Sequence, residues 1–167
     1  MGQSIENMSN QEIARLKEIV KALRDKETGC SWDKVQTHES LKPACIEEAA
    51  EVISGINIFK ETGNSENLKE ELGDLLLQIV FHASIAEDEG LFTFEDVAKT
   101  VSDKMVRRHP HVFGDKEYTE DEIHESWKRI KAKEKEGREW ETDYLKEAFD
   151  ESIELIHTAK RRKGFEE

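Results

Sequence analysis

The stretch that decides the fold is residues 43–87. Two apolar-striped segments, PACIEEAAEVISGINIF (43–59) and ENLKEELGDLLLQIVFHASIAE (66–87), flank the turn sequence TGNS (62–65). Apolar residues recur at three- and four-residue spacing in both segments, which predicts helices over about 40–59 and 66–87. Pro43 is compatible with the first turn of a helix, where no hydrogen bond from its nitrogen is needed. Because the connection is short, we expect the two helices to pack antiparallel.

Acidic residues lie beside the apolar stripe of each predicted helix. At about 100° per residue, Glu48 and Glu51 lie about 60° and 120° round the helix from its stripe, and Glu47 follows at about 160°. Glu71 and Asp74 repeat the arrangement of the first pair on the second helix. An antiparallel pair turns both acidic flanks to the same side and at the same depth. The pattern therefore predicts that the four carboxylates of these pairs converge at the rim of the core.

Such a cluster is electrostatically costly unless a cation or protons relieve it. Two like charges ~4 Å apart repel by ~4 kcal/mol at an effective dielectric of ~20. Oxygen ligands without a nearby His or Cys suit Mg²⁺ or Mn²⁺ and not Zn²⁺. The alternative is that the acids only cover solvated faces, as 38 acidic residues among 167 easily could.

The rest of the chain is also expected to be helical. Helical patterns occupy about 9–23, 93–109 and 119–130, residues 111–116 are expected to form a loop, and an amphipathic stretch over 144–156 ends in the basic run 160–163. We expect that basic run to be a solvated tail. Neither β-alternation nor an internal repeat is found, so the predicted fold class is all-α, an antiparallel helical bundle.

Charge and hydropathy exclude several classes of protein. With 25 basic and 38 acidic residues, the net charge of −13 argues against general binding of nucleic acids. No window approaches 18 consecutive apolar residues and the first residues lack a hydrophobic signal region, so neither a membrane span nor secretion is expected. Two cysteines are too few for a disulfide framework. We therefore expect a cytoplasmic protein.

Basic and aromatic residues offer candidate contacts to phosphates or bases. Lys104, Arg107 and Arg108 near the end of a predicted helix could bind phosphates or, alternatively, complement the helix dipole. Neighbouring residues point about 100° apart on a helix, so the two arginines are not expected to contact the same phosphate. Trp127 could stack on a base or fill the core, and Lys34 could reach a phosphate or stay solvated.

Two other functions stay open on the residues alone. A di-metal carboxylate oxidoreductase bundle needs Glu-x-x-His motifs on paired helices, and the chain offers Glu154-x-x-His157 and, less well, Asp121-x-x-His124. A non-catalytic helical module that binds nucleotides or a protein partner would need no hydrolytic chemistry at all.

The acidic pattern, Glu47-Glu48-x-x-Glu51 followed by Glu71-x-x-Asp74, resembles the signature of the MazG nucleoside triphosphate pyrophosphohydrolases. The stretches GCSWDK (29–34), EELGDLL (70–76), SDK (102–104), RRHPHVF (107–113) and WKRIK (127–131) are also similar to MazG sequences. The likeness therefore covers about residues 12–135. Ser31 departs from it, since family members often have proline there. The chain has one copy of these motifs, where many MazG proteins carry two.

The resemblance implies an all-α fold of the MazG-like pyrophosphatase type that binds Mg²⁺, with Mn²⁺ as a possible substitute. It implies hydrolysis of ribo- and deoxyribonucleoside triphosphates to the monophosphate and pyrophosphate, as nucleotide-pool house-cleaning. The metal ligands would be Glu48, Glu51, Glu71 and Asp74, and Glu47 and Glu48 would act in catalysis. The substrate contacts would be Lys104, Arg107, Arg108 and Trp127, and we add Lys34 to these.

The resemblance also suggests the domain organisation and the assembly. We expect a disordered N-terminus over residues 1–8, a MazG-like helical domain over 9–136, and a C-terminal helical extension of open role over 137–167. Because MazG domains usually dimerise, a homodimer or a higher homo-oligomer is expected.

Overall fold

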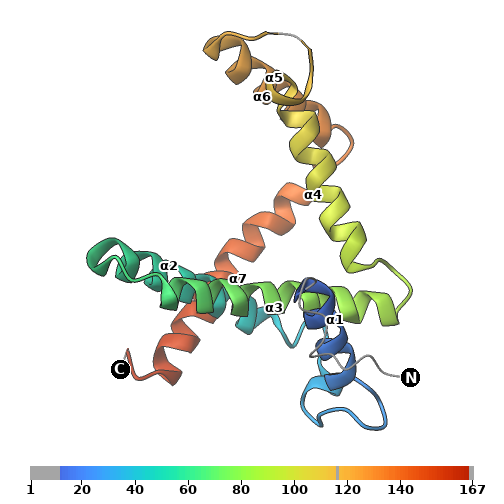
Figure 1. Ribbon diagram of the computed structural model, residues 1–167, viewed down its shortest axis with the longest axis vertical. Helices are drawn as coiled ribbons and strands as arrows, with labels where there is room; N and C mark the ends of the chain where they lie inside the picture. Colours follow the sequence, from blue (N-terminus) through green and yellow to red (C-terminus); the bar gives the residue numbers. More distant parts are fainter. Residues whose placement is uncertain (1–11, 116, 166–167) are drawn as a thin grey trace. The chain divides into compact units, whose positions relative to one another are not determined.

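The chain is all-α. The computed structural model describes residues 12–115 and 117–165, and every regular element within these ranges is helical (Figure 1). In this part of the chain, each helix is too short or too polar to cross a membrane. The expected disorder of residues 1–8 concerns a segment outside the described residues. The elements are α1 (Glu12–Leu23), the 3-10 helix η2 (Asp33–Val35), α2 (Lys42–Thr62), α3 (Glu66–Asp88), α4 (Phe94–Arg108), α5 (Pro110–Phe113), α6 (Glu120–Lys135) and α7 (Glu141–Arg162).

These helices form two compact units. Of the described residues, the first contains 12–94 together with 152–165, and the second contains 95–115 and 117–151. Helix α7, which belongs to the predicted C-terminal extension, therefore contributes its first half to the second unit and its second half to the first. The predicted acidic residues and Lys34 lie in the first unit, whereas Lys104, the two arginines and Trp127 lie in the second.

The antiparallel pair α2–α3 is the centre of the first unit, as the short turn predicted (Figure 1). Helix α1 packs on α3 and completes the core. The buried core side chains come from α1, from the residue preceding α2 and from the C-terminal half of α3: Val20, Leu41, Val80, Phe81 and Ile85. Full burial of an aliphatic or aromatic side chain of this size contributes roughly 1.5–3 kcal/mol, so these five residues fix α1 against α3.

The turn between α2 and α3 ends one helix and starts the next within three residues. Gly63 takes the left-handed conformation, with φ of 72°, and its N–H donates to the Phe59 carbonyl at the end of α2. Glycine adopts this conformation without a Cβ penalty. Asn64 Oδ1 then accepts from the N–H of Glu66, 2.9 Å away, at the first residue of α3. The local sequence therefore sets the register in which the two helices face each other.

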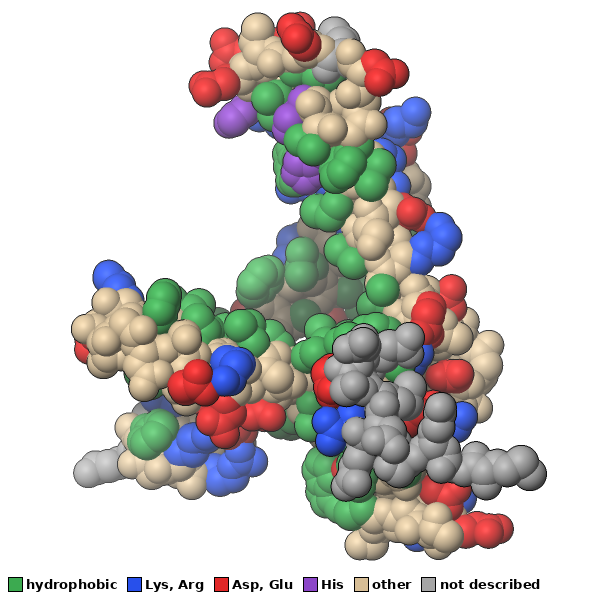
Figure 2. Space-filling model, viewed as in Figure 1, with side chains coloured by type: hydrophobic (Ala, Val, Ile, Leu, Met, Phe, Trp, Pro, Cys, Tyr) green, Lys and Arg blue, Asp and Glu red, His purple; other side chains and the backbone are tan. Residues whose placement is uncertain are grey.

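The predicted apolar stripes are only partly buried. Ala83 and Ala86 of α3 are buried as expected. Four other members of the two stripes remain 42% to 49% exposed, namely Ile56, Phe59, Leu72 and Ile79. Figure 2 shows apolar side chains at the surface along the α2–α3 pair. These residues stay exposed because α1 and the loop before α2 cover only the other end of α3.

The second unit contains one helical turn that the sequence did not predict. Residues 111–116 were expected to form a loop, but Pro110–Phe113 form α5, and Gly114 N–H donates to the Pro110 carbonyl over 3.0 Å. Proline is well suited to the first turn of a helix, since its fixed φ is already helical. Helix α6 begins with a capping box, the Thr-x-x-Glu pattern of residues 119–122, in which Thr119 and Glu122 bond reciprocally to each other's backbone N–H.

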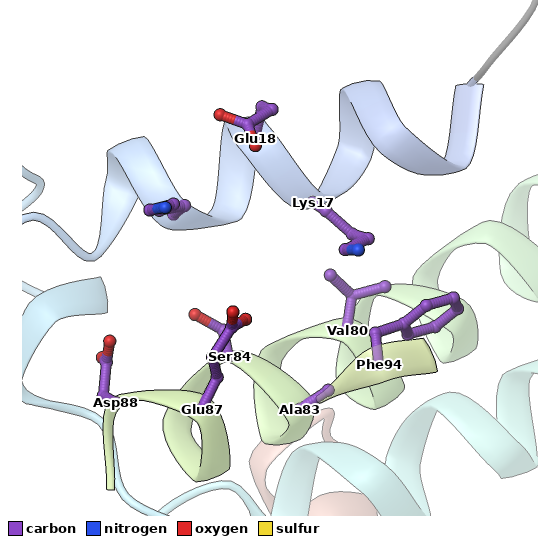
Figure 3. Close-up of a pocket in the computed structure, with 9 residues that line it drawn as sticks. Lys17, Glu18, Val80, Ala83, Ser84, Glu87, Asp88 and Phe94 are labelled. Atoms are coloured by element: carbon purple, nitrogen blue, oxygen red, sulfur yellow. The ribbon is translucent and has the colours of Figure 1, made fainter. Parts of the chain in front are cut away.

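A small cavity lies where α1 faces the C-terminal half of α3 (Figure 3). It has a volume of about 180 Å³, and the Lys17 ammonium lies 5.7 Å from the centre of the Phe94 ring at its edge. Nearby, Arg24 donates to Ser84 Oγ over 3.1 Å and to Asp88 over 2.8 Å. These polar contacts fasten the end of α1 to α3.

Candidate active site

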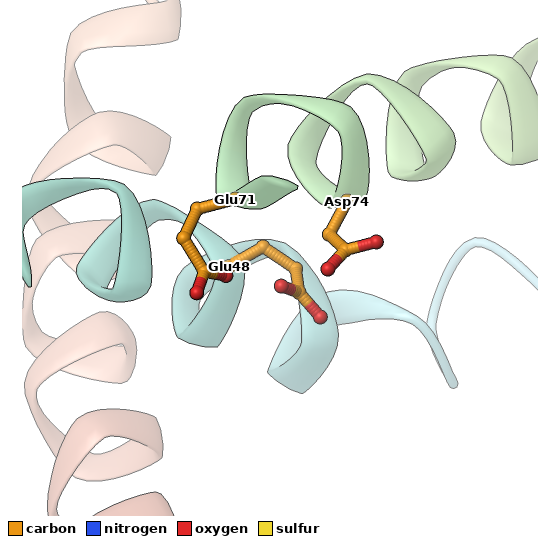
Figure 4. Close-up of side chains that lie close together, drawn as sticks. All are labelled: Glu48, Glu71 and Asp74. Carbon is orange, nitrogen blue, oxygen red and sulfur yellow. The ribbon is translucent and has the colours of Figure 1, made fainter. Parts of the chain in front are cut away.

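Three acidic side chains converge between α2 and α3. One carboxylate oxygen from each of Glu48, Glu71 and Asp74 lies within 4.8 Å of the others (Figure 4). Glu48 comes from α2 and the other two come from neighbouring turns of α3, as the helical projection predicted. Among the described residues, this is the only group of three or more Asp, Glu, His or Cys side chains that close together. Neither of the alternative motifs that contain His124 and His157 forms such a group.

Glu48 carries the clearest sign that this cluster is built to hold a ligand. Its Oε2 atom is buried and has no hydrogen-bond partner among the described residues. Burial raises the pKa of Glu48, and the neighbouring carboxylates Glu51, Asp74, Glu47 and Glu71 raise it further. A buried carboxylate oxygen without a partner is unfavourable in the chain alone. A divalent cation with a preference for oxygen ligands would satisfy that oxygen and remove the repulsion, so the donor set fits Mg²⁺ or Mn²⁺.

Glu71 is oriented by a residue that sequence reasoning missed. Asn67, one turn earlier on α3, donates from its Nδ2 atom to Glu71 Oε1 over 2.8 Å. The (i, i+4) spacing of an amide and an acid on one helix face was the available signal. This bond holds the carboxylate of Glu71 in place beside the other two acids.

The two other predicted site acids of α2, Glu47 and Glu51, pair with cations from the end of α7. Arg162 pairs with Glu47, and Lys163 pairs with both Glu47 and Glu51. The expectation of a solvated basic tail was therefore wrong for these two residues, because the C-terminal half of α7 belongs to the same unit as α2. Glu51, predicted as a metal ligand, lies outside the group of three but close enough to raise the Glu48 pKa.

The pairing changes the acidity of Glu47 in the direction opposite to that of Glu48. Burial alone would raise the pKa of Glu47, but hydrogen bonds and charge from Lys163 and Arg162 lower it overall. The Lys163 pKa is raised because its ammonium donates to Glu51 and Glu47. Adjacent carboxyl groups on one helix thus differ in character, with Glu47 held ionised and Glu48 more easily protonated.

In the second unit, Arg107 and Arg108 converge on one carboxylate. Arg107 Nε lies 2.8 Å from Glu134 Oε1, and Arg108 Nη2 lies 2.6 Å from Glu134 Oε2. These bonds lower the pKa of Glu134 to about 2. Their long side chains bend together onto one carboxylate despite the ~100° between their positions on the helix. The two guanidinium groups are therefore positioned to bind an anionic group. The prediction that they do not contact the same phosphate stays a prediction.

Lys104 and Trp127 accompany the arginine pair. Lys104, both arginines and Glu134 line a cavity of about 630 Å³. The Arg108 guanidinium lies 5.4 Å from the centre of the Trp127 ring, and the His109 ring meets Trp127 edge-on, with centroids 5.0 Å apart. Trp127 is half-buried between these groups. The four predicted residues of this unit thus form one basic and aromatic cluster.

Lys34, the remaining predicted substrate contact, lies in η2 and belongs to the loop that precedes α2. Its ammonium is 3.5 Å from the carbonyl oxygen of Lys26 in the same loop. Trp32 beside it is 58% exposed. The structure gives Lys34 a place in the first unit but no contact with the acids.

Three polar side chains in a row lie next to the acids, and the sequence patterns did not predict their contacts. Cys45 Sγ lies 3.2 Å from His82 Nε2, and His82 Nδ1 lies 2.7 Å from His38 Nδ1. Burial raises the pKa of the Cys45 thiol, and burial together with His38 lowers the pKa of His82. Cys45 is one turn before Glu48 on α2. Cys45 and His82 lie on facing apolar sides of two paired helices, and this placement was the signal in the sequence that could have revealed their contact.

Comparison with known proteins agrees with this geometry. Residues 36–113 match the model of the MazG nucleotide pyrophosphohydrolase domain. The nucleoside triphosphate pyrophosphohydrolase/pyrophosphatase MazG of Thermotoga maritima is 52% identical over 117 residues, which are 70% of this chain and 43% of the relative. The nucleoside triphosphate pyrophosphohydrolase of Escherichia coli is 43% identical over 125 residues, or 74% of this chain and 46% of the relative.

A third relative, the uncharacterised protein YabN of Bacillus subtilis, is 45% identical over 135 residues, or 80% of this chain and 27% of its own length. The chain thus spans less than half the length of these three relatives. All five acidic residues of the site lie inside the matched range, as do Lys104 and both arginines. The cluster of carboxylates, the paired arginines and these matches together show that the chain carries, in residues 36–113, a domain of the MazG nucleotide pyrophosphohydrolase family.

Proposed function

We propose that this chain hydrolyses nucleoside triphosphates to the monophosphate and pyrophosphate and that it depends on Mg²⁺, with Mn²⁺ as a substitute. The observation that carries the proposal is the group Glu48, Glu71 and Asp74, in which a buried carboxylate oxygen lacks a partner. Glu51 would join these three as a metal ligand. The names of the relatives support the reaction, since two of them are named for this activity.

In this proposal, some of the acids bind the metal ion and Glu47 orients the attacking water. A divalent cation bound here would neutralise the charge that develops on the leaving group. Glu47, held ionised by its cations, is the candidate to orient the attacking water and accept its proton. The water oxygen bonds to the α- or the β-phosphorus, and the bridging P–O bond between them breaks. The group on the other side of that bond leaves with its electrons, so the products are the monophosphate and pyrophosphate in both cases.

The basic and aromatic residues would hold the substrate. Arg107 and Arg108 already bind a carboxylate, and phosphate oxygens offer the same bidentate geometry. Lys104 adds a further positive charge to that cavity, Trp127 offers a ring face for stacking, and Lys34 is a candidate phosphate contact. We propose ribo- and deoxyribonucleoside triphosphates, including damaged ones, as substrates in a house-cleaning role.

The proposal includes self-association and a cytoplasmic location. Ile56, Phe59, Leu72 and Ile79 remain about half exposed along α2 and α3, which supports a homodimer or a higher homo-oligomer that covers them. Light scattering coupled to size exclusion tests this, and a monomer at micromolar concentration would contradict it. Cys30 and Cys45 are free thiols, a state that a reducing compartment preserves.

The function is tested by measuring pyrophosphate and orthophosphate release from a panel of common and damaged nucleoside triphosphates, with and without Mg²⁺. We expect pyrophosphate and a monophosphate as primary products, only when the metal is present. Release of orthophosphate and a diphosphate would contradict the reaction. Nucleotide binding without turnover would favour a non-catalytic module, and bound iron without triphosphatase activity would favour an oxidoreductase.

A further inference from the structure

The C-terminal end of α7 places two cations on the acidic face of α2. Lys163 Nζ lies 3.0 Å from Glu47 Oε1 and also pairs with Glu51, while Arg162 pairs with the other oxygen of Glu47. Glu47 is largely covered in this arrangement, with 15% of its side chain exposed. Figure 2 shows basic and acidic side chains meeting next to the C-terminal end of the chain.

Lys163 lies where the acidic residues meet a cavity, and Arg162 precedes it in sequence. The cavity has a volume of about 440 Å³, and its walls are the α2–α3 pair on one side and the end of α7 on the other. Glu71, a member of the acid cluster, lines it together with Glu47, Glu51 and Lys163. The remaining lining is mostly small or apolar and includes Ala50, Ile156, Ala159 and Phe165. A ligand in this cavity would contact both the carboxylates and Lys163.

Charge balance shows why cations are needed at this point. The five carboxylates of the site and a divalent cation leave a negative sum, which repels the four negative charges of a triphosphate. Arg162 and Lys163 add two positive charges next to Glu47 and Glu51. Once a metal ion neutralises Glu51, that carboxylate attracts Lys163 less strongly, and the ammonium becomes available to another anion at the same place.

We propose that Arg162 and Lys163 bind the phosphates of the nucleotide, exchanging the carboxylates of Glu47 and Glu51 for phosphate oxygens when the metal binds. This inference rests on the proposed function and adds two substrate contacts from outside the matched range 36–113. It assigns the end of the C-terminal extension a role in the site. The same two residues keep the acids neutralised before the metal and the nucleotide arrive.

The adjacent arginine provides a matched control. Arg161 donates to Thr158 Oγ1 over 3.2 Å on its own helix, whereas Arg162 pairs with Glu47. Arg161→Gln removes the same charge from the same turn of α7 as Arg162→Gln does. Any effect of net charge alone appears in both variants, whereas a contact with phosphate is lost in only one of them.

The test compares two binding measurements by calorimetry on the full chain. The first titrates Mg²⁺ alone, and the second titrates a non-hydrolysable α,β-methylene nucleoside triphosphate in the presence of Mg²⁺. For Arg162→Gln/Lys163→Gln we expect Mg²⁺ to bind as tightly as in the wild type or more tightly, because competing cations are gone. We expect the analogue to bind roughly tenfold to a hundredfold more weakly, as for the loss of charged hydrogen bonds. The single variant Lys163→Arg should bind the analogue nearly as tightly as the wild type, whereas Lys163→Gln should bind it more weakly.

The outcomes separate this inference from the function on which it rests. If the wild type binds and hydrolyses triphosphates but the double variant binds the analogue with unchanged affinity, the inference alone is overturned. A parallel loss of Mg²⁺ affinity would also overturn it, since the contacts would then only support the geometry of the acids. A wild type that binds neither the analogue nor Mg²⁺ would overturn both proposals.

Discussion

Gly55 of α2 lies directly against the backbone of Leu68 of α3. A Cβ atom on Gly55 would lie 2.8 Å from the Leu68 Cα and 3.2 Å from its nitrogen. A backbone atom cannot move aside as a flexible side chain does, so only glycine allows the two helices to approach this closely. The approach occurs between the turn and the acid cluster, and it brings carboxylates from two helices within reach of one cation.

We expect Gly55→Ala to destabilise the chain and Gly73→Ala to stabilise it. Both glycines are inside helices, but a Cβ on Gly73 would meet nothing within 4 Å. Overpacking at residue 55 costs about 1–3 kcal/mol and exceeds the ~1 kcal/mol gained from the better helix propensity of alanine. At residue 73 only the gain of ~0.5–1 kcal/mol applies. Urea unfolding of both variants checks the pair, and equal shifts would contradict the close approach.

Glu71→Gln should abolish Mg²⁺-dependent pyrophosphate release, whereas Glu70→Gln should leave it near wild type. The two residues are neighbours on α3 and lose the same charge, but only Glu71 belongs to the acid cluster. Glu48→Gln and Asp74→Asn should behave like Glu71→Gln.

The metal-free thermal stability of Glu48→Gln should hold or rise, because the repulsion within the cluster falls. A Glu48 variant with full activity would remove that residue from the site.

Arg107→Ala and Arg108→Ala should each lower kcat/KM by roughly tenfold to a hundredfold, and their effects should be strongly non-additive. The reason is that both guanidinium groups converge on one anion position, now occupied by Glu134. We also expect Arg108→Ala to lose more thermal stability, because the Arg108 side chain is 19% exposed and the Arg107 side chain is 52% exposed. A double-mutant cycle under saturating Mg²⁺ measures the coupling. If both variants keep the wild-type kcat/KM but have a lower thermal stability, the two arginines have a structural role only.

The chain should lose stability in mild acid because of His82. Its pKa is lowered in the folded chain by burial and by His38, so the unfolded chain takes up a proton there more readily. The contribution is complete above the unfolded pKa of about 6.5 and is lost as the pH falls through that value toward the lowered pKa. Urea unfolding at about pH 7.5 and about pH 5.5 should show a smaller decrease for His82→Gln than for wild type. Equal decreases would show that His82 does not contribute.

Local patterns in the sequence were sufficient for the α2–α3 pair and for the convergence of Glu48, Glu71 and Asp74. Helical periodicity and a short turn fix both the rotation and the depth of these acids, because the relevant contacts are close in sequence. The capping box at Thr119 was predictable for the same reason.

The features that the sequence did not reveal depend on contacts over long separations or on side-chain flexibility. Arg162 meets Glu47 across 115 positions, and His82 meets Cys45 across 37. Periodicity places a residue on a helix face but does not identify the partner of that face. It also gives only the direction of a Cα–Cβ bond, which is why Arg107 and Arg108 could converge on Glu134.

The three-residue connection between α2 and α3 has a consequence for the speed of folding. Contacts that are local in sequence form early, so the hairpin brings its carboxylates together before the C-terminal cations can reach them. The repulsion between these carboxylates, which the proposed metal ion would relieve, thus opposes the formation of the hairpin itself. We expect the metal-free Glu48→Gln chain to refold faster than the wild type in stopped-flow experiments, and an unchanged rate would show that the hairpin forms after the rate-limiting barrier. The carboxylates proposed to hold a metal ion would then also determine how quickly the chain reaches its folded state.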